Sequence, residues 1–226
     1  MQSIHLTTAN EARTPATTVT RALLICAVIA GPLYMLVVFA QAFMRPGFEI
    51  TRHSASLLSN GDWGWIQITN FLVTGLLVIL GAVGIWRAQR GSGSTWAPLL
   101  IALYGLGMIG GGIFVADPAM GFPVGTPEDA NTISTTGLLH FATGGAGFLG
   151  LIAACLLFAR SFAKRGQRGW AIYSAATGVI FFAAFVGIAS GAGNVWTISG
   201  FWSAMLFAWA WLSLLALRLL AGLRAA

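Results

Sequence analysis

The stretch ALLICAVIAGPLYMLVVFAQAFM, residues 22–44, holds no Asp, Glu, Lys or Arg. An α-helix rises about 1.5 Å per residue, so a run of about 20 apolar residues crosses a hydrocarbon core roughly 30 Å thick. This run is longer than the apolar part of a signal peptide, which has about 7–15 residues, and it lacks a clear small-residue cleavage site. We therefore predict that it is the first transmembrane helix of the chain.

Five further apolar segments of similar length follow the first one. They cover about residues 65–86, 96–116, 137–159, 170–190 and 197–220. Hydrophobic residues make up 57% of the chain and charged residues 8%, whereas a soluble domain carries about 25% charged residues. We predict an all-α fold, a polytopic bundle of six transmembrane helices that forms one domain over residues 21–221. Residues 1–20 are expected to be a disordered cytoplasmic tail, and residues 222–226 a short cytoplasmic C-terminus.

Basic residues concentrate on one predicted side of the membrane, the side of the two termini. Ten of the twelve Lys and Arg residues fall there: Arg13, Arg21, Arg87, Arg90, Arg160, Lys164, Arg165, Arg168, Arg218 and Arg224. Because cytoplasmic segments carry the excess of Lys and Arg, both termini are predicted to be cytoplasmic. The net charge of +6 is thereby assigned to orientation in the membrane. We expect membrane lipids, and no nucleic acid, as partners, since the basic residues do not form one stripe.

The two predicted outer connections, residues 45–64 and 117–136, are longer than a turn requires and carry chemically active side chains. In the first, the segment TRHSASLLSNG (51–61) reads as a short interfacial helix that turns Leu57 and Leu58 toward the bundle, with Gly61 as its C-terminal stop. In the second, Asp117 follows the third span directly. Function is therefore expected at this outer side.

Polar residues within the spans also gather toward the outer side. Gln67 and Asn70 lie on one helical face, His140 lies about one turn inside the fourth span with Thr136 beside it, and Asn194 lies between the last two spans. Gly144 and Gly147 follow His140 at i+4 and i+7, as a small-residue face suited to close helix contact.

Unpaired polar groups near hydrocarbon are costly, so these side chains are expected to surround an enclosed, outward-facing polar pocket. The candidate ligand-binding residues of this pocket are Arg52, His53, Ser54, Gln67, Asn70, Thr136 and Asn194. The candidate catalytic residues are Asp117 and His140. Each also has a structural interpretation: a turn residue before proline for Asp117, an interhelical hydrogen bond for His140, and contacts between helices for Gln67 and Asn70.

A metal or acid–base centre is the sharper interpretation of the outer residues. His53, Asp117 and His140 offer imidazole and carboxylate groups, which are common zinc ligands. The two histidines are far apart in the sequence, however, and no HxxxH or HExxH spacing occurs. No cofactor is therefore predicted; a divalent metal such as zinc stays an alternative, as does acid–base chemistry by Asp117 and His140.

Two outer stretches resemble the signature region of domain-of-unknown-function family 998, a family of bacterial six-helix membrane proteins. They are RPGFEITRHSASLLSNGDWGWIQITNFLVTGLL (45–77) and GGGIFVADPAMGFPVGTP (110–127) with the following GLLHF (137–141). The resemblance extends over nearly the whole chain and implies the same six-helix architecture in a bacterial-type cytoplasmic membrane, but no activity. Where many members read HGxxH, this chain has Thr136 in place of the first histidine.

Three kinds of function remain open from the sequence. The favoured interpretation is a membrane protein that binds a lipid, a small hydrophobic molecule or a membrane partner in the outer pocket. A membrane-embedded enzyme would act on a lipid-like or isoprenoid-like substrate through Asp117 and His140. A small-molecule transporter is the other alternative, although the spans hold no deep charged residue near the midplane.

Overall fold

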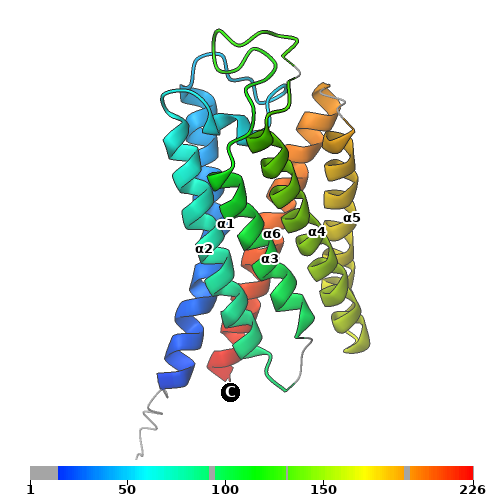
Figure 1. Ribbon diagram of the computed structural model, residues 1–226. Helices are drawn as coiled ribbons and strands as arrows, with labels where there is room; N and C mark the ends of the chain where they lie inside the picture. The colour runs from blue at the N-terminus through cyan, green and yellow to red at the C-terminus, as the bar shows by residue number, and fades with distance from the viewer. Residues whose placement is uncertain (1–14, 92–94, 131, 191–193, 226) are drawn as a thin grey trace, which may run out of the picture.

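The computed structural model describes residues 15–91, 95–130, 132–190 and 194–225. These residues form six long helices and a short 3₁₀ helix (Figure 1). The elements are α1 (Pro15–Met44), η1 (Ala55–Ser59), α2 (Gly64–Ala88), α3 (Trp96–Ile113), α4 (Thr135–Lys164), α5 (Arg168–Ala189) and α6 (Val195–Ala225). All six α-helices are long and apolar enough to cross a membrane. The predicted all-α bundle of six membrane-spanning helices is confirmed, and the described residues form no β-strand.

The helices are arranged as a closed ring. Each helix packs against the next one along the chain, and α6 closes the ring by packing between α5 and α1 (Figure 1). Residues 45–63 and 114–134 cover one end of the ring, which we call the loop end. The other end carries Arg87, Arg90, Lys164 and Arg168 and is called the basic end; α1 begins and α6 ends there.

The helix at the start of the chain is longer than expected. Residues 15–20, predicted to belong to a disordered tail, form the first turns of α1, and residues 222–225 continue α6 instead of forming a tail. Pro15 suits the first helical position, since its fixed φ is helical and it needs no hydrogen-bond acceptor there. The Thr20 hydroxyl donates to the Ala16 carbonyl (2.9 Å) and accepts from Arg87 Nε (3.0 Å), which ties this turn to α2. Residues 1–14, Arg13 included, lie outside the described part of the chain.

Small residues set the separation between the neighbouring helices α2 and α3. A Cβ built on Gly75 would lie 2.6 Å from the Gly105 carbonyl oxygen, and one on Gly105 would lie 2.7 Å from the Gly75 carbonyl oxygen. Such distances leave no room for any side chain, so the two backbones touch. These helices, together with α4, form the closely packed side of the ring.

A glycine and a proline in α1 form the joint with α6. A Cβ on Gly31 would lie 2.9 Å from the Cβ of Trp209, so only glycine admits this tryptophan. Pro32 lies inside α1 and has no N–H, which leaves the carbonyl of Val28, four residues earlier, without its helical donor. The Ser213 hydroxyl on α6 donates to that carbonyl at 3.0 Å. The hydrogen bond that proline removes within α1 is thus replaced by one from α6.

Candidate functional site

The loop end is held together by Arg45, which follows the last residue of α1. Its guanidinium donates to the carbonyl oxygens of Leu58 and Asn60, both at 2.5 Å, and lies 4.9 Å from the centre of the Phe122 ring. Burial lowers the pKa of Arg45 from its ordinary value, and the charge of Asp62 opposes this shift. Arginine stays charged in proteins, so the guanidinium provides a permanent anchor for η1.

The predicted short helix between the first two spans is present as η1, inside the segment 51–61. Leu57 and Leu58 are buried, as predicted, and pack into the end of the bundle. Gly61 follows with a φ of +72°, a conformation that favours glycine and turns the chain toward α2.

His53 is a fully enclosed residue of the loop end, 1% exposed. Its Nδ1 accepts from the Glu49 N–H (2.9 Å) and its Nε2 donates to the Met120 carbonyl (2.9 Å). Because one ring nitrogen accepts and the other donates, these bonds fit the neutral imidazole. The His53 carbonyl also accepts from Trp202 Nε1 at 3.1 Å. Nδ1 thus bonds within the first loop, and Nε2 joins the first loop to the second.

Arg52 also joins the two loops, but on their outer surface. Its guanidinium forms an ion pair and a hydrogen bond with Glu128 of the second loop. The two side chains are 38% and 68% exposed, so this pair is well hydrated and contributes little to stability.

Gln67 and Asn70 belong to a buried network between α1 and α2. Gln41 Nε2 donates to Gln67 Oε1 (3.0 Å), Asn70 Nδ2 donates to the Tyr34 carbonyl (3.2 Å), and the Thr74 hydroxyl donates to Asn70 Oδ1 (3.2 Å). Each amide is used between helices. The polar stripe predicted from the sequence therefore faces α1, and Gln41, its main partner, was not identified from the sequence.

Asp117 fastens the second loop to the start of α4. Its two carboxylate oxygens accept from the Ser134 hydroxyl (2.5 Å) and from the Ser134 N–H (2.8 Å). Ser134 in turn caps α4 by accepting from the Gly137 N–H at 3.0 Å. A Cβ on Gly137 would collide with the Asp117 carboxylate, so this clasp requires a glycine there.

Thr136 and Asn194 lie apart from the other candidates. Thr136 is exposed in the first turn of α4. Asn194 caps α6, since its side-chain oxygen accepts from the N–H groups of Trp196 and Thr197, both at 3.0 Å. Neither residue lines the cavity beside His140 that is described below.

His140 points into the ring, as predicted, and is 8% exposed. Its Nδ1 contacts the Phe114 carbonyl at 2.8 Å. A carbonyl only accepts, so Nδ1 carries the proton, and Nε2 of the neutral ring is an acceptor. Among the described residues no hydrogen bond joins His140 to Asp117, and no group of three or more His, Cys, Asp or Glu side chains is placed to hold a metal.

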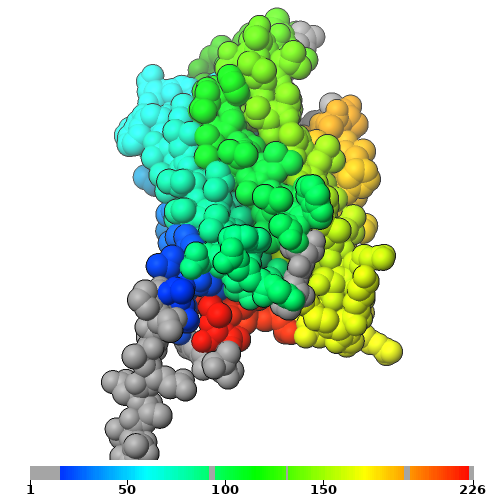
Figure 2. All heavy atoms as spheres, turned by 60° about the horizontal axis from the view of Figure 1, so that its bottom comes forward, coloured from blue at the N-terminus to red at the C-terminus, as the bar shows by residue number. Residues whose placement is uncertain are grey.

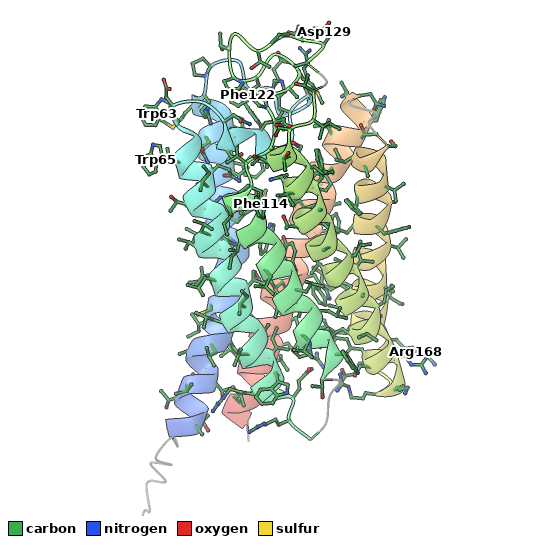
Figure 3. The ribbon with its side chains drawn as sticks, viewed as in Figure 1. Trp63, Trp65, Phe114, Phe122, Asp129 and Arg168 are labelled. Carbon is green, nitrogen blue, oxygen red and sulfur yellow. The ribbon has the colours of Figure 1, made fainter. Side chains whose placement is uncertain are left out.

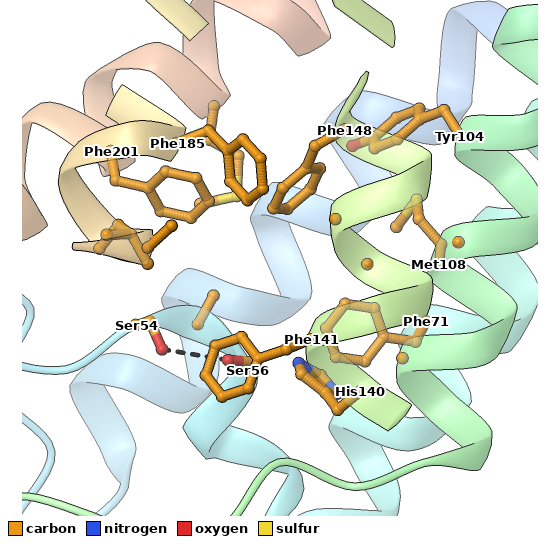
Figure 4. Close-up of a pocket in the computed structure, with 18 of the residues that line it drawn as sticks. Ser54, Ser56, Phe71, Tyr104, Met108, His140, Phe141, Phe148, Phe185 and Phe201 are labelled. Atoms are coloured by element: carbon orange, nitrogen blue, oxygen red, sulfur yellow. Dashed lines mark hydrogen bonds between the residues drawn. The ribbon is translucent and has the colours of Figure 1, made fainter. Parts of the chain in front are cut away.

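A cavity lies beside His140, and all six helices and η1 contribute to its wall. It has a volume of about 110 Å³ and is partly open. Figure 4 shows the rings of Phe148, Phe185 and Phe201 on one side of this space and those of Phe141, His140 and Phe71 on the other. Its polar side chains are few: Tyr34, Ser54, Ser56, Tyr104 and His140. The hydroxyl groups of Ser54 and Ser56 contact each other at 3.0 Å.

This cavity differs from the polar pocket expected from the sequence. Of the predicted site residues, only Ser54 and His140 line it. Thr136 is exposed, and the others form hydrogen bonds between α1 and α2, within or between the two loops, or at the start of a helix. Apolar residues line most of it instead, and seven of the nineteen lining residues are Phe or Tyr. The sequence does not mark these residues, because apolar side chains are expected on every face of a membrane helix.

The cavity is partly open, and we infer from three observations that it opens between α4 and α5. The buried residues of α5 all lie between Ser174 and Phe181, and the rest of the helix toward the loop end has none. On α4, no atom outside the glycine's own helical turn lies within 4 Å of a Cβ built on Gly144. Phe141 lines the cavity and is yet 58% exposed, so its ring stands at the border between the cavity and the outer surface of the bundle.

The predicted small-residue face of α4 is therefore divided between two roles. A Cβ on Gly147 would lie 3.0 Å from the Cα of Gly107, which confirms close contact with α3. Gly144 makes no such contact and leaves space in the cavity wall, contrary to the prediction. The spacing of Gly144 and Gly147 predicts that they share one face of α4, but such a face is about 100° wide. The spacing therefore does not tell which neighbouring helix each glycine points to.

The outer surface of the bundle has the features of a membrane protein. Trp63 and Trp65 point away from the ring near the loop end, and Arg168 points away at the basic end (Figure 3). Both tryptophans are more than half exposed, at 61% and 62%. Such rings are typical of the boundary between lipid and water.

With six membrane-spanning helices, two loops over one end and a largely apolar cavity beneath them, the molecule is a polytopic integral membrane protein. A family model described as "Protein of unknown function (DUF998)" matches residues 28–218, from the middle of α1 to the last third of α6. The chain belongs to this family of uncharacterised membrane proteins. Comparison with curated proteins and with solved structures gave no match.

Proposed function

We propose that this protein binds the hydrocarbon chain of a lipid, or a small hydrophobic molecule of similar shape, in the cavity at the loop end. The observation that carries the proposal is the apolar, aromatic wall of a cavity of about 110 Å³ to which every helix contributes. Protein interiors are close-packed, and an apolar space of this size stays dry when empty and accepts an apolar guest. The few polar groups on its wall suit the polar end of such a molecule.

The opening between α4 and α5 supports entry from the membrane. At the basic half, α5 is held firmly: a Cβ on Gly178 would lie 3.1 Å from the Cys155 Cβ, and Ser174 accepts from Trp211 Nε1 at 3.0 Å. At the loop-end half, Gly145 meets only Phe185, at 3.4 Å from its Cβ position. A chain that enters there comes from hydrocarbon, because the opening lies within the length of both spans.

The polar end of the guest is expected near the loops. Ser54 and Ser56 of the first loop line the cavity, as does His140, whose Nε2 is an acceptor in the neutral ring. A hydroxyl or ester group is compatible with these partners. The guest would therefore lie with its chain among the Phe148, Phe185 and Phe201 rings.

We place the basic end in the cytoplasm and the loop end outside, in a bacterial-type cytoplasmic membrane. This orientation rests on charge: the described acidic residues, Glu49, Asp62, Asp117, Glu128 and Asp129, all lie in the loop-end segments. The described basic residues other than Arg45 and Arg52 lie toward the basic end, on helices or in the turns that follow them. The cavity then lies in the outer half of the membrane, and η1 lies at its outer interface.

The test is a binding experiment with the purified full-length protein in a nonionic detergent and a fatty acid whose fluorescence rises in apolar surroundings. Gly144→Leu places a side chain in the cavity, and Gly200→Leu is the matched control, because its Cβ position is open and Gly200 does not line the cavity. Leucine suits a helix better than glycine, so both variants should fold.

We expect Gly144→Leu to weaken binding at least about tenfold, a change of about 1.4 kcal/mol, and Gly200→Leu to leave it unchanged. Equal binding by wild type and Gly144→Leu would contradict the proposal. The hydrogen bonds of Asp117 and His140 give no support to acid–base catalysis by this pair, and no observation favours transport.

A further inference from the structure

A second hollow lies at the basic end, far from the cavity, where the start of α1 meets the ends of α2 and α6. Its volume is about 270 Å³, and it is lined by Thr17 and Thr20 of α1, Arg87 and Arg90 of α2 and Leu223 of α6, among others. Figure 2 shows this end of the molecule, with the start of α1 in blue beside the end of α6 in red. The hollow thus lies at the ends of three of the helices that are long and apolar enough to span a membrane.

Each of the two arginines contacts a neighbouring residue that orients its guanidinium. Arg87 Nε donates to the Thr20 hydroxyl at 3.0 Å, and its Nη2 donates to the Ala16 carbonyl at 3.5 Å. The Arg90 guanidinium lies 4.3 Å from the centre of the Trp86 ring. A guanidinium whose position is already set loses less conformational freedom when it binds a planar or tetrahedral oxyanion.

Neither arginine has a carboxylate partner within the described residues. The ion pair found there is Arg52 with Glu128, and all described acidic residues lie at the loop end. The remaining acidic residue, Glu11, lies outside the described part of the chain. Basic side chains close to a membrane surface attract anionic lipids, each by about 1 kcal/mol.

We propose that this hollow binds the phosphate group of an anionic phospholipid from the leaflet at the basic end. Arginine forks match phosphate oxygens, with two N–H groups directed at one anion. Leu223 and Ala88 supply an apolar side for the upper part of the lipid chains. The site does not depend on the cavity at the loop end, and either can fail without the other.

The test uses the full-length protein in nonionic detergent at low salt, titrated with short-chain phosphatidylglycerol or with phosphatidylcholine of the same chains. The readout is the midpoint of thermal unfolding as a function of lipid concentration. We expect a saturable rise with phosphatidylglycerol alone, because only that lipid brings a net negative charge. Removing one arginine near a membrane surface weakens binding about fivefold, so Arg87→Gln and Arg90→Gln should each show that loss.

Arg168→Gln is the matched control, since it removes the same charge from the same end outside the hollow. It should leave the titration unchanged; a loss as large as that of Arg90→Gln would show a general effect of surface charge and overturn the proposal. Because Arg87 also supports α1, Arg87→Lys is a second variant that keeps the charge and should bind more tightly than Arg87→Gln.

Two further arms identify the source of the anion. Inorganic phosphate should fail to raise the unfolding midpoint. If it causes a saturable rise that Arg90→Gln abolishes, the ligand of the hollow is a soluble phosphate compound and the lipid proposal is overturned. If Glu11 were the partner of these arginines, wild type would show no rise and Glu11→Gln would create one. That result would also overturn the proposal.

Discussion

Replacing Ser213 with alanine removes the donor that α6 supplies to the Val28 carbonyl at 3.0 Å. Pro32 has no N–H, so α1 cannot supply another donor, and the carbonyl loses its partner. A net hydrogen bond contributes about 0.5–1.5 kcal/mol, and side-chain hydrogen bonds within membranes average about 0.6 kcal/mol. We expect Ser213→Ala to lower the free energy of unfolding by about 1 kcal/mol.

The same change should matter far less when residue 32 has an N–H. In Pro32→Ala, the new N–H reaches the Val28 carbonyl within the helix, so the Ser213 hydroxyl is no longer its required donor. The four proteins of the double-mutant cycle are therefore expected to show a coupling of about 1 kcal/mol between positions 32 and 213. Ser203→Ala is the matched control on the same helix, because Ser203 is exposed and bonds only to the Ser199 carbonyl of its own helix.

The assay is unfolding in mixed micelles with a rising fraction of sodium dodecyl sulfate, followed by the helical circular dichroism signal. Ser203→Ala should stay within about 0.5 kcal/mol of wild type, as surface substitutions usually do. The reasoning is refuted if Ser213→Ala costs the same with proline and with alanine at position 32, because the hydroxyl would then not be compensating for the missing N–H.

Three more substitutions test separate parts of the structure. Arg45→Ala should lower stability by about 1–3 kcal/mol, measured by the same assay, because two loop carbonyls lose their charged donor; an unchanged value would refute the role of Arg45 as anchor. Asp117→Ala should speed proteolysis within 117–134 while fatty-acid binding is kept, whereas loss of binding with an intact loop would assign Asp117 to the ligand site. Gly105→Ala should cost about 1–3 kcal/mol by overpacking, and Gly222→Ala, whose Cβ position is open, should cost nothing.

The six helices were predictable because hydrocarbon imposes the same two requirements on each span. The backbone polar groups must be paired, which a helix achieves almost entirely within itself, and the side chains that face lipid must be apolar. Length and composition therefore suffice to locate a span. The charges on the connecting segments carried further information, since the described acidic residues all lie in the two loop-end segments. Helix ends were less predictable: α1 begins at Pro15, and Arg87 of α2 bonds to its first turns at Thr20 and Ala16, a tertiary contact that no local sequence pattern indicates.

The site was predicted less well than the fold, because the sequence does not say which polar groups pair. Gln67 and Asn70 were expected around a pocket, yet their amides are used by Gln41 and Tyr34 of α1. His53 was a candidate ligand, and both its nitrogens bond to backbone groups of the loops.

His140 was placed correctly in the interior of the ring, beside a cavity whose wall is aromatic. That wall depends on how far α5 leans from α4 at Gly144 and Gly145, and this is a property of packing along the whole helix. Spacing within one segment cannot supply it.

The central claim is that the cavity at the loop end holds a hydrocarbon chain. The most direct measurement is an experimental structure of the purified protein in a lipid nanodisc, at a resolution that separates side chains. The proposal predicts elongated density between the Phe148 and Phe201 rings that continues to the outer surface between α4 and α5 beside Gly144. A cavity that has collapsed onto its own side chains, or one that holds only ordered water, would contradict it.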